Sequence, residues 1–231
     1  MQFVETNSFE VVSAIHELGR PDESLHFVLF PMIHIGEKNY YEDVAARASR
    51  CDLLLVEGVP SVWARMATRA YGLLAGRLGL VTQRELNLKT LGPKIINADM
   101  SAEEFNSAYA RLPFLAWAIL PIFLPLFGLY FLFTGSREYL AKKLETTDLP
   151  SRKDILNTTS ETDALESLLV NRRDRAFVKR LESFFEESSG KPLTVGIMYG
   201  AKHMPAIFRF LSSRLGYRVI SSNRAVVFSL V

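Results

Sequence analysis

Short apolar runs that end in a polar residue constrain this fold most. Two such runs are residues 26–34 and 52–57, and the segment 40–50 between them has an apolar side and a charged side. A short run that is apolar throughout is typical of a strand buried on both faces of a parallel sheet. A strand, a helix and a second strand within about 30 residues form a βαβ unit. The pattern predicts an α/β fold with a mostly parallel sheet flanked by helices.

The remaining chain predicts further elements around this unit. With 231 residues, of which 48% are apolar, the chain is long enough for one large core, and we expect residues 1–231 to form one domain. Further strands are expected at residues 93–99, 193–199, 217–221 and 225–230. Further helices are expected at residues 62–88, after the Ser101/Glu104 capping-box pattern, between residues 160 and 185, and at residues 205–215.

Residues able to bind metal or to transfer protons follow these strands. His34 ends the first strand, Glu57 the second and Asp99 the third, and His203 follows the fourth by a few residues. Ligands of an open parallel sheet bind beyond the carboxyl ends of its strands, so we expect the four side chains to gather at one edge. Each has a structural alternative, such as a packed histidine, a loop charge or a helix cap. A shared site is favoured because three strands would otherwise carry such a residue at the same end by accident.

Two kinds of chemistry suit histidines and carboxylates gathered in this way. One is a divalent metal such as zinc, manganese or iron, which activates water near neutral pH when a coordination position is open. The other is metal-free general acid–base chemistry, in which a glutamate orients a histidine. The sequence contains no His-Glu-x-x-His pattern and no cysteine pair, so the spacing leaves both open.

Five segments in chain order also carry a family resemblance. They are Phe30-Pro-Met-Ile-His-Ile-Gly36, Leu53-Leu-Leu-Val-Glu-Gly58, Ile95-Ile-Asn-Ala-Asp99, Asn171-Arg-Arg-Asp174 and Tyr199-Gly-Ala-Lys-His-Met-Pro-Ala-Ile207. Together they resemble the TraB/PrgY/GumN family, which includes the Tiki metalloproteases. The resemblance implies an α/β fold shared with erythromycin-esterase-like and ChaN-like haem-uptake proteins. It also implies a metal-dependent hydrolase, or a peptidase in the Tiki branch.

The resemblance implies a ligand set as well. On this resemblance, His34, Glu57 and His203 would bind the metal or activate water. The position of Asp99 at the end of the third strand makes it a further candidate ligand. The cofactor would be a divalent ion of manganese, zinc or cobalt. The substrate would be a peptide or a small molecule with an amide or ester bond.

The helix motif supplies the remaining roles that the resemblance implies. Arg173 would hold a substrate carboxylate or an anionic intermediate, and Asp174 would orient a neighbouring side chain. A solvated helix face with local ion pairs is the structural alternative for this arginine-rich turn. Two other functions stay open. One alternative is a non-catalytic peptide- or small-molecule-binding regulator of the pheromone-shutdown type, and the other is a membrane-associated adaptor.

One segment departs from the pattern of a globular domain. No charged residue occurs from Leu112 to Ser136, which is long enough to span a bilayer. A single span would separate His34 from His203, and its three prolines disfavour one straight helix. We therefore expect a hydrophobic helical insertion at residues 106–145. It would meet a membrane through residues 112–134, or pack against the domain or in a homodimer.

Charge and cysteine content limit partners and location. The net charge is +2, from 27 basic and 25 acidic residues without a charge block, so we expect no nucleic acid partner. Cys51 is the only cysteine, which excludes a disulfide framework. The first residues lack a basic start followed by an apolar stretch, so we expect no signal peptide. A cytoplasmic or peripheral, monotopic membrane location is expected.

Overall fold

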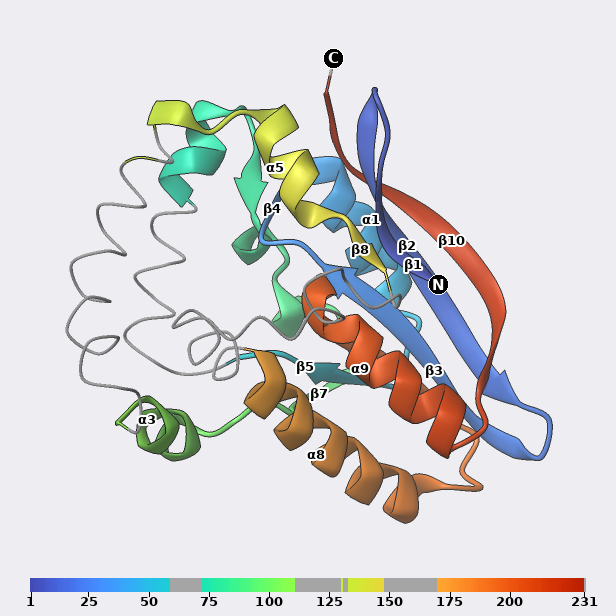
Figure 1. Ribbon diagram of the computed structural model, residues 1–231. Helices are drawn as coiled ribbons and strands as arrows, with labels where there is room; N and C mark the ends of the chain where they lie inside the picture. The colour runs from blue at the N-terminus through green and yellow to red at the C-terminus, as the bar shows by residue number, and fades with distance from the viewer. Residues whose placement is uncertain (59–71, 111–129, 131–132, 148–169, 231) are drawn as a thin grey trace, which may run out of the picture.

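The computed structural model of the chain describes residues 1–58, 72–110, 130, 133–147 and 170–230 (Figure 1). The strands are β1 (Gln2–Thr6), β2 (Glu10–Arg20), β3 (Glu23–Met32), β4 (Ile35–Gly36), β5 (Leu53–Val56), β6 (Val81–Thr82), β7 (Lys94–Asn97), β8 (Thr146–Thr147), β9 (Thr194–Gly200) and β10 (Arg218–Ser229). The helices are α1 (Lys38–Ala48), α3 (Ala102–Ala110), α5 (Arg137–Leu144), α8 (Arg172–Ser188) and α9 (Met204–Arg209), and residues 72–77 are also helical.

A mixed sheet forms the centre of the described part. Its order is β7-β5-β9-β3-β2-β1-β8, and β10 pairs with the other edge of β2. The strands β7, β5, β9 and β3 are parallel, whereas β2, β1, β8 and β10 pair antiparallel. The predicted α/β fold with a helix-flanked sheet is confirmed, but parallel order is limited to four strands. Short connections after β1 and β2 allow only antiparallel neighbours, because a parallel return needs a long crossover.

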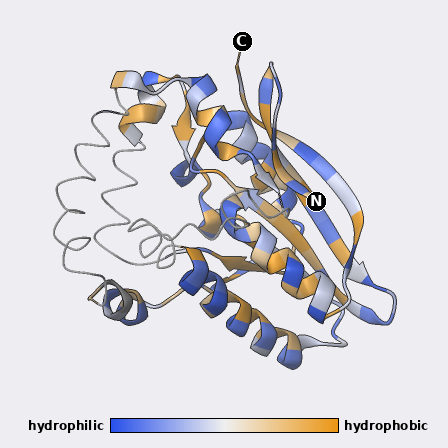
Figure 2. Ribbon diagram, in the orientation of Figure 1, coloured by the Kyte–Doolittle hydropathy of each residue, from blue (hydrophilic) through white to orange (hydrophobic). Residues whose placement is uncertain are grey.

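Each central strand contributes to two apolar cores. In β5, Leu54 and Val56 belong to the core on one face, and Leu53 and Leu55 to the core on the other. The helices α1 and α5 cover the first face, and α8 and α9 cover the second (Figure 1). The central strands are accordingly hydrophobic, while the outer sides of α8 are hydrophilic (Figure 2). Burial on both faces explains why these strands read as continuous apolar runs.

The register aligns the carboxyl ends of the four parallel strands. Val56 of β5 pairs with Asn97 of β7 and with Met198 of β9, and Met32 of β3 pairs with Gly200 of β9. The residues that follow these strands therefore start from one edge of the sheet.

The amino-terminal strands were not predicted by the apolar pattern. β2 is buried along most of its length between β10 on one edge and β1 and β3 on the other. The two late strands predicted at residues 217–221 and 225–230 are one strand, β10. It stays continuous through polar residues because it pairs with β2 over its whole length.

The helix predicted at residues 62–88 ends earlier than expected. Residues 59–71 lie outside the described part, and the helix from residue 72 stops at Gly79, whose φ is 66°. A glycine in this left-handed conformation is a common helix end. Residues 81–82 then form β6, which pairs with β4.

Most of the predicted hydrophobic insertion at residues 106–145 lies outside the described residues. Its described ends include part of α3 and the whole of α5. None of the helices in the described ranges is both long enough and apolar enough to cross a bilayer.

Candidate functional site

Arg173 connects the two carboxylates that follow β5 and β7. Its Nη2 lies 2.5 Å from Glu57 Oε1 and 2.5 Å from Asp99 Oδ2, and its Nε donates to Asp99 Oδ1 at 3.1 Å. Arg173 comes from the first turn of α8, whose amino end lies beside the ends of these strands (Figure 1). A planar guanidinium suits such two-pronged pairing with a carboxylate. A fixed positive charge therefore already lies between Glu57 and Asp99.

Asp99 is fully engaged by this network. Its Oδ1 also accepts from the backbone N–H of Met100 at 2.8 Å, and its Oδ2 accepts from that of Gly58 at 3.2 Å. The side chain is 0% exposed. A buried carboxylate of this kind is stable only when its oxygens are paired, so Asp99 anchors Arg173.

Glu57 connects Arg173 with the last residue of β9, because its two carboxylate oxygens bind one each. Its Oε2 accepts from the backbone N–H of Gly200 at 2.5 Å, and its side chain is 15% exposed. A Cβ placed on Gly200 would lie 2.9 Å from Glu57 Oε2 and 3.3 Å from His203 Cδ2. Glycine at this position therefore allows the carboxylate and the imidazole to approach the same point.

His203 is paired with the neighbour of Arg173 on α8. Its Nδ1 lies 2.6 Å from Asp174 Oδ1, and the His203 side chain is only 8% exposed. Since a carboxylate accepts, Asp174 favours the tautomer of the neutral imidazole that has its proton on Nδ1 and its lone pair on Nε2. The Tyr199 ring makes a T-shaped contact with the imidazole, with the ring centroids 4.9 Å apart. Pairing and packing together fix the orientation of the His203 ring.

His34 lies at the margin of this cluster. It is exposed, and its Nδ1 lies 3.1 Å from Gln83 Oε1. A positive charge on His34 would add to the effects that lower the pKa of Glu57. The structure thus brings together Glu57, Asp99 and His203 and leaves His34 more open to solvent.

The charges of the cluster stabilise its ionised state. Burial alone would raise the pKa of Glu57, but Arg173 and the histidines outweigh it and hold that pKa below the ordinary 4.5. Burial also opposes ionisation of Asp99, yet the hydrogen bonds and charge of Arg173 hold its pKa below 3.8. Burial would likewise lower the pKa of Arg173, but Asp99 and Glu57 raise it above its usual range. The network is therefore a guanidinium with two carboxylates at neutral pH.

The predicted metal ligands fit a metal ion only in part. In the part of the chain that the structure describes, no three His, Cys, Asp or Glu side chains are arranged to hold one. A metal on Asp99 would have to displace Arg173, because every oxygen direction of Asp99 is used. The atoms left for a metal are Nε2 of His203 and the second lone pairs of the Glu57 oxygens, and His34 would add a nitrogen only by exchanging existing contacts such as the one with Gln83.

Three residues of the site had no predicted role. Gly200 allows the close approach described above, and a glycine that ends a strand is a signal for such contact. Tyr199 is fully buried between Arg173 and His203, and burial raises its pKa, so its hydroxyl stays neutral. Asn97 donates to the Gly58 carbonyl at 2.8 Å and accepts from the Asp99 N–H at 2.9 Å, which links the two strand ends.

Comparisons with family models, with curated proteins and with solved structures gave no match to this chain.

Proposed function

We propose that this chain is a hydrolase that activates water at His203 and cleaves an amide or ester bond. The observation that supports this most directly is the His203–Asp174 pair, with 2.6 Å between Nδ1 and Oδ1. A histidine oriented in this way by a carboxylate is the arrangement that general-base catalysis uses. The resemblance to the TraB/PrgY/GumN family agrees with this activity.

In the proposed reaction, Nε2 of His203 takes a proton from water as the oxygen attacks the substrate carbonyl. The carbonyl oxygen then becomes an oxyanion. His203 returns the proton to the leaving amine or alcohol as the bond to carbon breaks, so the base is regenerated. Glu57 and Asp99 hold Arg173 in place during this cycle rather than taking part in the proton transfer.

Arg173 is suited to bind the oxyanion. Its Nε and Nη2 are used by Glu57 and Asp99, whereas Nη1 makes no hydrogen bond with any described residue. The side chain is 13% exposed, so these donors lie in a mostly dry site where they act strongly. A fixed guanidinium with two unused N–H groups is a preorganised binding point for developing negative charge.

Hydrolysis of p-nitrophenyl esters and of acyl-p-nitroanilides by the purified chain tests the proposal. His203→Gln should lower kcat by about 10²–10⁴, the range for loss of a general base. His26→Gln is the matched control, because His26 lies at the amino end of β3, opposite the site. Equal activity of both variants, or no hydrolysis by the parent of any substrate, would contradict the proposal.

A metal-dependent form of the same hydrolase is the second candidate. It is favoured by the approach of Glu57 Oε2 and His203 Cδ2 to one point beside Gly200. His34 follows β3 and starts from the same edge of the sheet. A divalent ion of manganese, zinc or cobalt would have to draw Glu57, His203 and His34 closer together, because no three such side chains of the described part are arranged to hold one. Such an ion would lower the pKa of a bound water.

Metal analysis separates the two forms. The parent is purified without chelator and compared with the His34→Ala/His203→Ala double variant by mass spectrometry of bound metals. Near-stoichiometric metal that is lost in a folded double variant supports the metal-dependent form. A metal-free parent that hydrolyses substrate, even after incubation with manganese, zinc and cobalt, supports water activation by His203 alone.

A further inference from the structure

In the part of the chain that the structure describes, β7 is the edge strand of the sheet. β7 pairs with β5, and the described residues include no strand on its other side. The N–H groups of Lys94 and Ala98 point to β5, where they donate to Asp52 and Val56. Successive residues of a strand present their N–H and C=O groups to opposite edges. Ile95 and Asn97 therefore present their backbone donors and acceptors outward.

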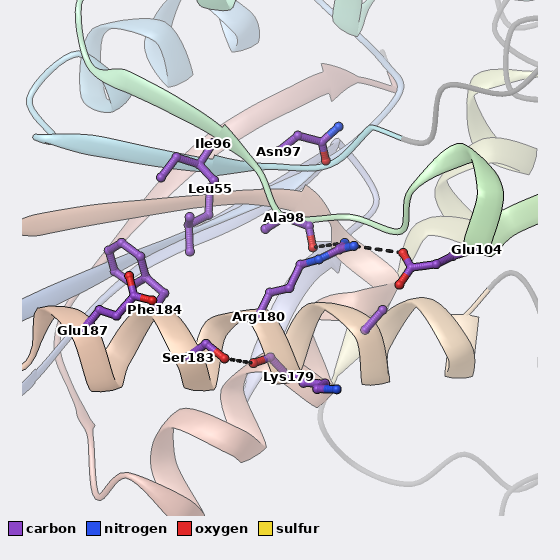
Figure 3. Close-up of a pocket in the computed structure, with 11 residues that line it drawn as sticks. Leu55, Ile96, Asn97, Ala98, Glu104, Lys179, Arg180, Ser183, Phe184 and Glu187 are labelled. Carbon is purple, nitrogen blue, oxygen red and sulfur yellow. Dashed lines mark hydrogen bonds and ion pairs between the residues drawn. The ribbon is translucent and has the colours of Figure 1, made fainter.

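A pocket of about 430 Å³ lies directly beneath this edge (Figure 3). Leu55 and Ile96 come from the strands above it, and Phe184 comes from α8 below. Arg180 closes one end, because it donates to the Ala98 carbonyl at 3.1 Å and to Glu104 at 2.9 Å. The pocket thus has apolar walls and a charged rim, in the size range of ligand sites.

The pocket and the catalytic cluster share the same two elements. Arg173 and Arg180 are two turns apart on α8, and they bind the consecutive residues Asp99 and Ala98 at the end of β7. A ligand that lies along β7 and continues past the carboxyl end of the strand therefore comes to Asp99 and Arg173, and it must turn across the end of β5 to reach His203 beyond β9.

We infer that the edge of β7 binds an extended peptide as an additional strand and presents it to the proposed catalytic cluster. The backbone groups of Ile95 and Asn97 would pair with the peptide, and an apolar side chain of the peptide would enter the pocket beside Ile96 and Phe184. Added strands bind through their main chain, and pockets for alternate side chains select the sequence. The inference rests on the proposed hydrolase function and specifies its substrate class.

A peptide fits this surface better than a compact small molecule does. The open backbone groups of β7 form a row along the strand, which only another extended backbone can pair with. The pocket lies beside the backbone groups of β7 and not at the catalytic cluster itself. A substrate that uses the pocket must therefore be long enough to extend from the pocket to the cluster. A chain of several residues does so, with one side chain in the pocket and one peptide bond at His203.

Binding is measured separately from cleavage. The probes are synthetic ten-residue peptides without proline, with capped ends and one leucine or phenylalanine among Ala, Ser and Gly. They are titrated by fluorescence anisotropy against the full-length His203→Gln variant. Amide hydrogen exchange is then recorded with and without the tightest peptide. We expect slower exchange in residues 94–98 when peptide is bound.

Two variants test the geometry. Ile95→Pro removes an outward N–H and leaves the bonds from β7 to β5 in place, and it should weaken binding about tenfold or more. Ile95→Val keeps the N–H and should change binding less than about twofold. If Ile95→Pro does not fold, Ser183→Trp, which fills the pocket mouth, replaces it, with Ser183→Ala as its control.

The outcomes distinguish this inference from the proposed function. Three results would overturn the strand-addition inference. They are peptide binding without slower amide exchange in residues 94–98, equal peptide binding by Ile95→Pro and Ile95→Val, and no binding of any probe peptide. Binding with protection, but without cleavage by the parent, leaves the inference standing and contradicts the hydrolase. Ester or anilide hydrolysis without peptide binding supports the hydrolase and overturns the strand-addition inference.

Discussion

Gly200 is the residue where packing and chemistry meet most closely. Its φ of −52° is open to any residue, so only space excludes a side chain. A Cβ would lie 2.9 Å from Glu57 Oε2, which is closer than real contacts of this kind. We expect Gly200→Ala to displace Glu57 and His203, to cost about 1–3 kcal/mol in the free energy of unfolding, and to lower hydrolysis.

Gly76→Ala is the matched control for this substitution. A Cβ at Gly76 would meet nothing within 4 Å, and residue 76 is helical and exposed. Alanine should therefore stabilise the chain by up to about 1 kcal/mol. Urea unfolding of both variants checks the opposite signs, and a stable, active Gly200→Ala variant would contradict the close approach at the site.

Arg173 determines how the stability of the site depends on pH. The pKa values of Glu57 and Asp99 are lowered in the folded state from 4.5 and 3.8. Their contribution is therefore fully present above pH 4.5 and is lost as the pH falls through the lowered values. Arg173→Met leaves two buried carboxylates without a cation and should cost about 3–5 kcal/mol at pH 7.

The loss of unfolding free energy caused by Arg173→Met should be smaller at acidic pH, because protonation neutralises the carboxyl groups that the substitution leaves unpaired. Urea unfolding at pH 7 and at pH 4 measures this. Arg180→Met is the control on the same helix, and it should cost about 1 kcal/mol or less because its ion pair with Glu104 is half-exposed. An equal loss in Arg173→Met at both pH values would show that the carboxylates do not depend on this guanidinium.

At the scale of elements, Glu23 connects the start of β3 to the turn between α8 and β9. Its carboxylate accepts from Ser189 Oγ at 2.5 Å and from the Gly190 N–H at 2.6 Å, and its side chain is 3% exposed. The Ser189 hydroxyl is the main reason that the pKa of Glu23 lies below 4.5. This contact fixes where β9 begins against β3, and β9 leads to His203.

Glu23→Gln should cost about 1–3 kcal/mol at neutral pH, because two short charge-assisted hydrogen bonds are weakened. Because the pKa of Glu23 is lowered in the folded state, its ionised carboxylate stabilises the fold above pH 4.5, and this contribution is lost as the pH falls through the lowered pKa. The difference in unfolding free energy between Glu23→Gln and the parent should therefore shrink as the pH falls toward 3. Chemical denaturation across this range is the measurement. Glu186→Gln, on the exposed side of α8, should stay within about 0.5 kcal/mol of the parent.

At the scale of the whole molecule, Arg137 ties together segments that are far apart in the chain. It donates to the Leu78 carbonyl at 3.0 Å, to the Ser229 carbonyl at 2.7 Å and to Glu37 Oε1 at 3.1 Å. These contacts join α5 to the end of the helix at residues 72–77, to β10 and to the start of α1. They also position the chain where α5 follows the apolar segment.

Arg137→Met should therefore lower the free energy of unfolding by about 2 kcal/mol, since three buried or half-buried acceptors lose a charged donor. Thermal and urea unfolding test this. Lys142→Met, at an exposed position of the same helix, should change stability by about 0.5 kcal/mol or less. Similar losses of unfolding free energy in the two variants would mean that water can replace the hydrogen bonds of Arg137.

Local pattern predicted the parallel half of this fold and the place of its site. Apolar runs with polar ends located β3, β5 and β9, because a strand buried on both faces must be largely apolar, and a shorter run located the half-buried edge strand β7. Since parallel strands end at one edge, the pattern also predicted that Glu57, Asp99 and His203 lie close together. The Ser101/Glu104 capping box was confirmed in the same local way, through its two reciprocal hydrogen bonds.

Tertiary structure alone decided which groups in the site face each other. The sequence determined that carboxylates and histidines share an edge, but not that Arg173 is held between Glu57 and Asp99 or that Asp174 pairs with His203. These pairings depend on how α8 docks on the sheet. The antiparallel strands β1 and β2 were missed and β10 was predicted as two strands for a related reason, because the stability of these strands comes from long-range pairing. Local periodicity reports which face of an element is buried, whereas the partner across that face is set by the packing of distant segments.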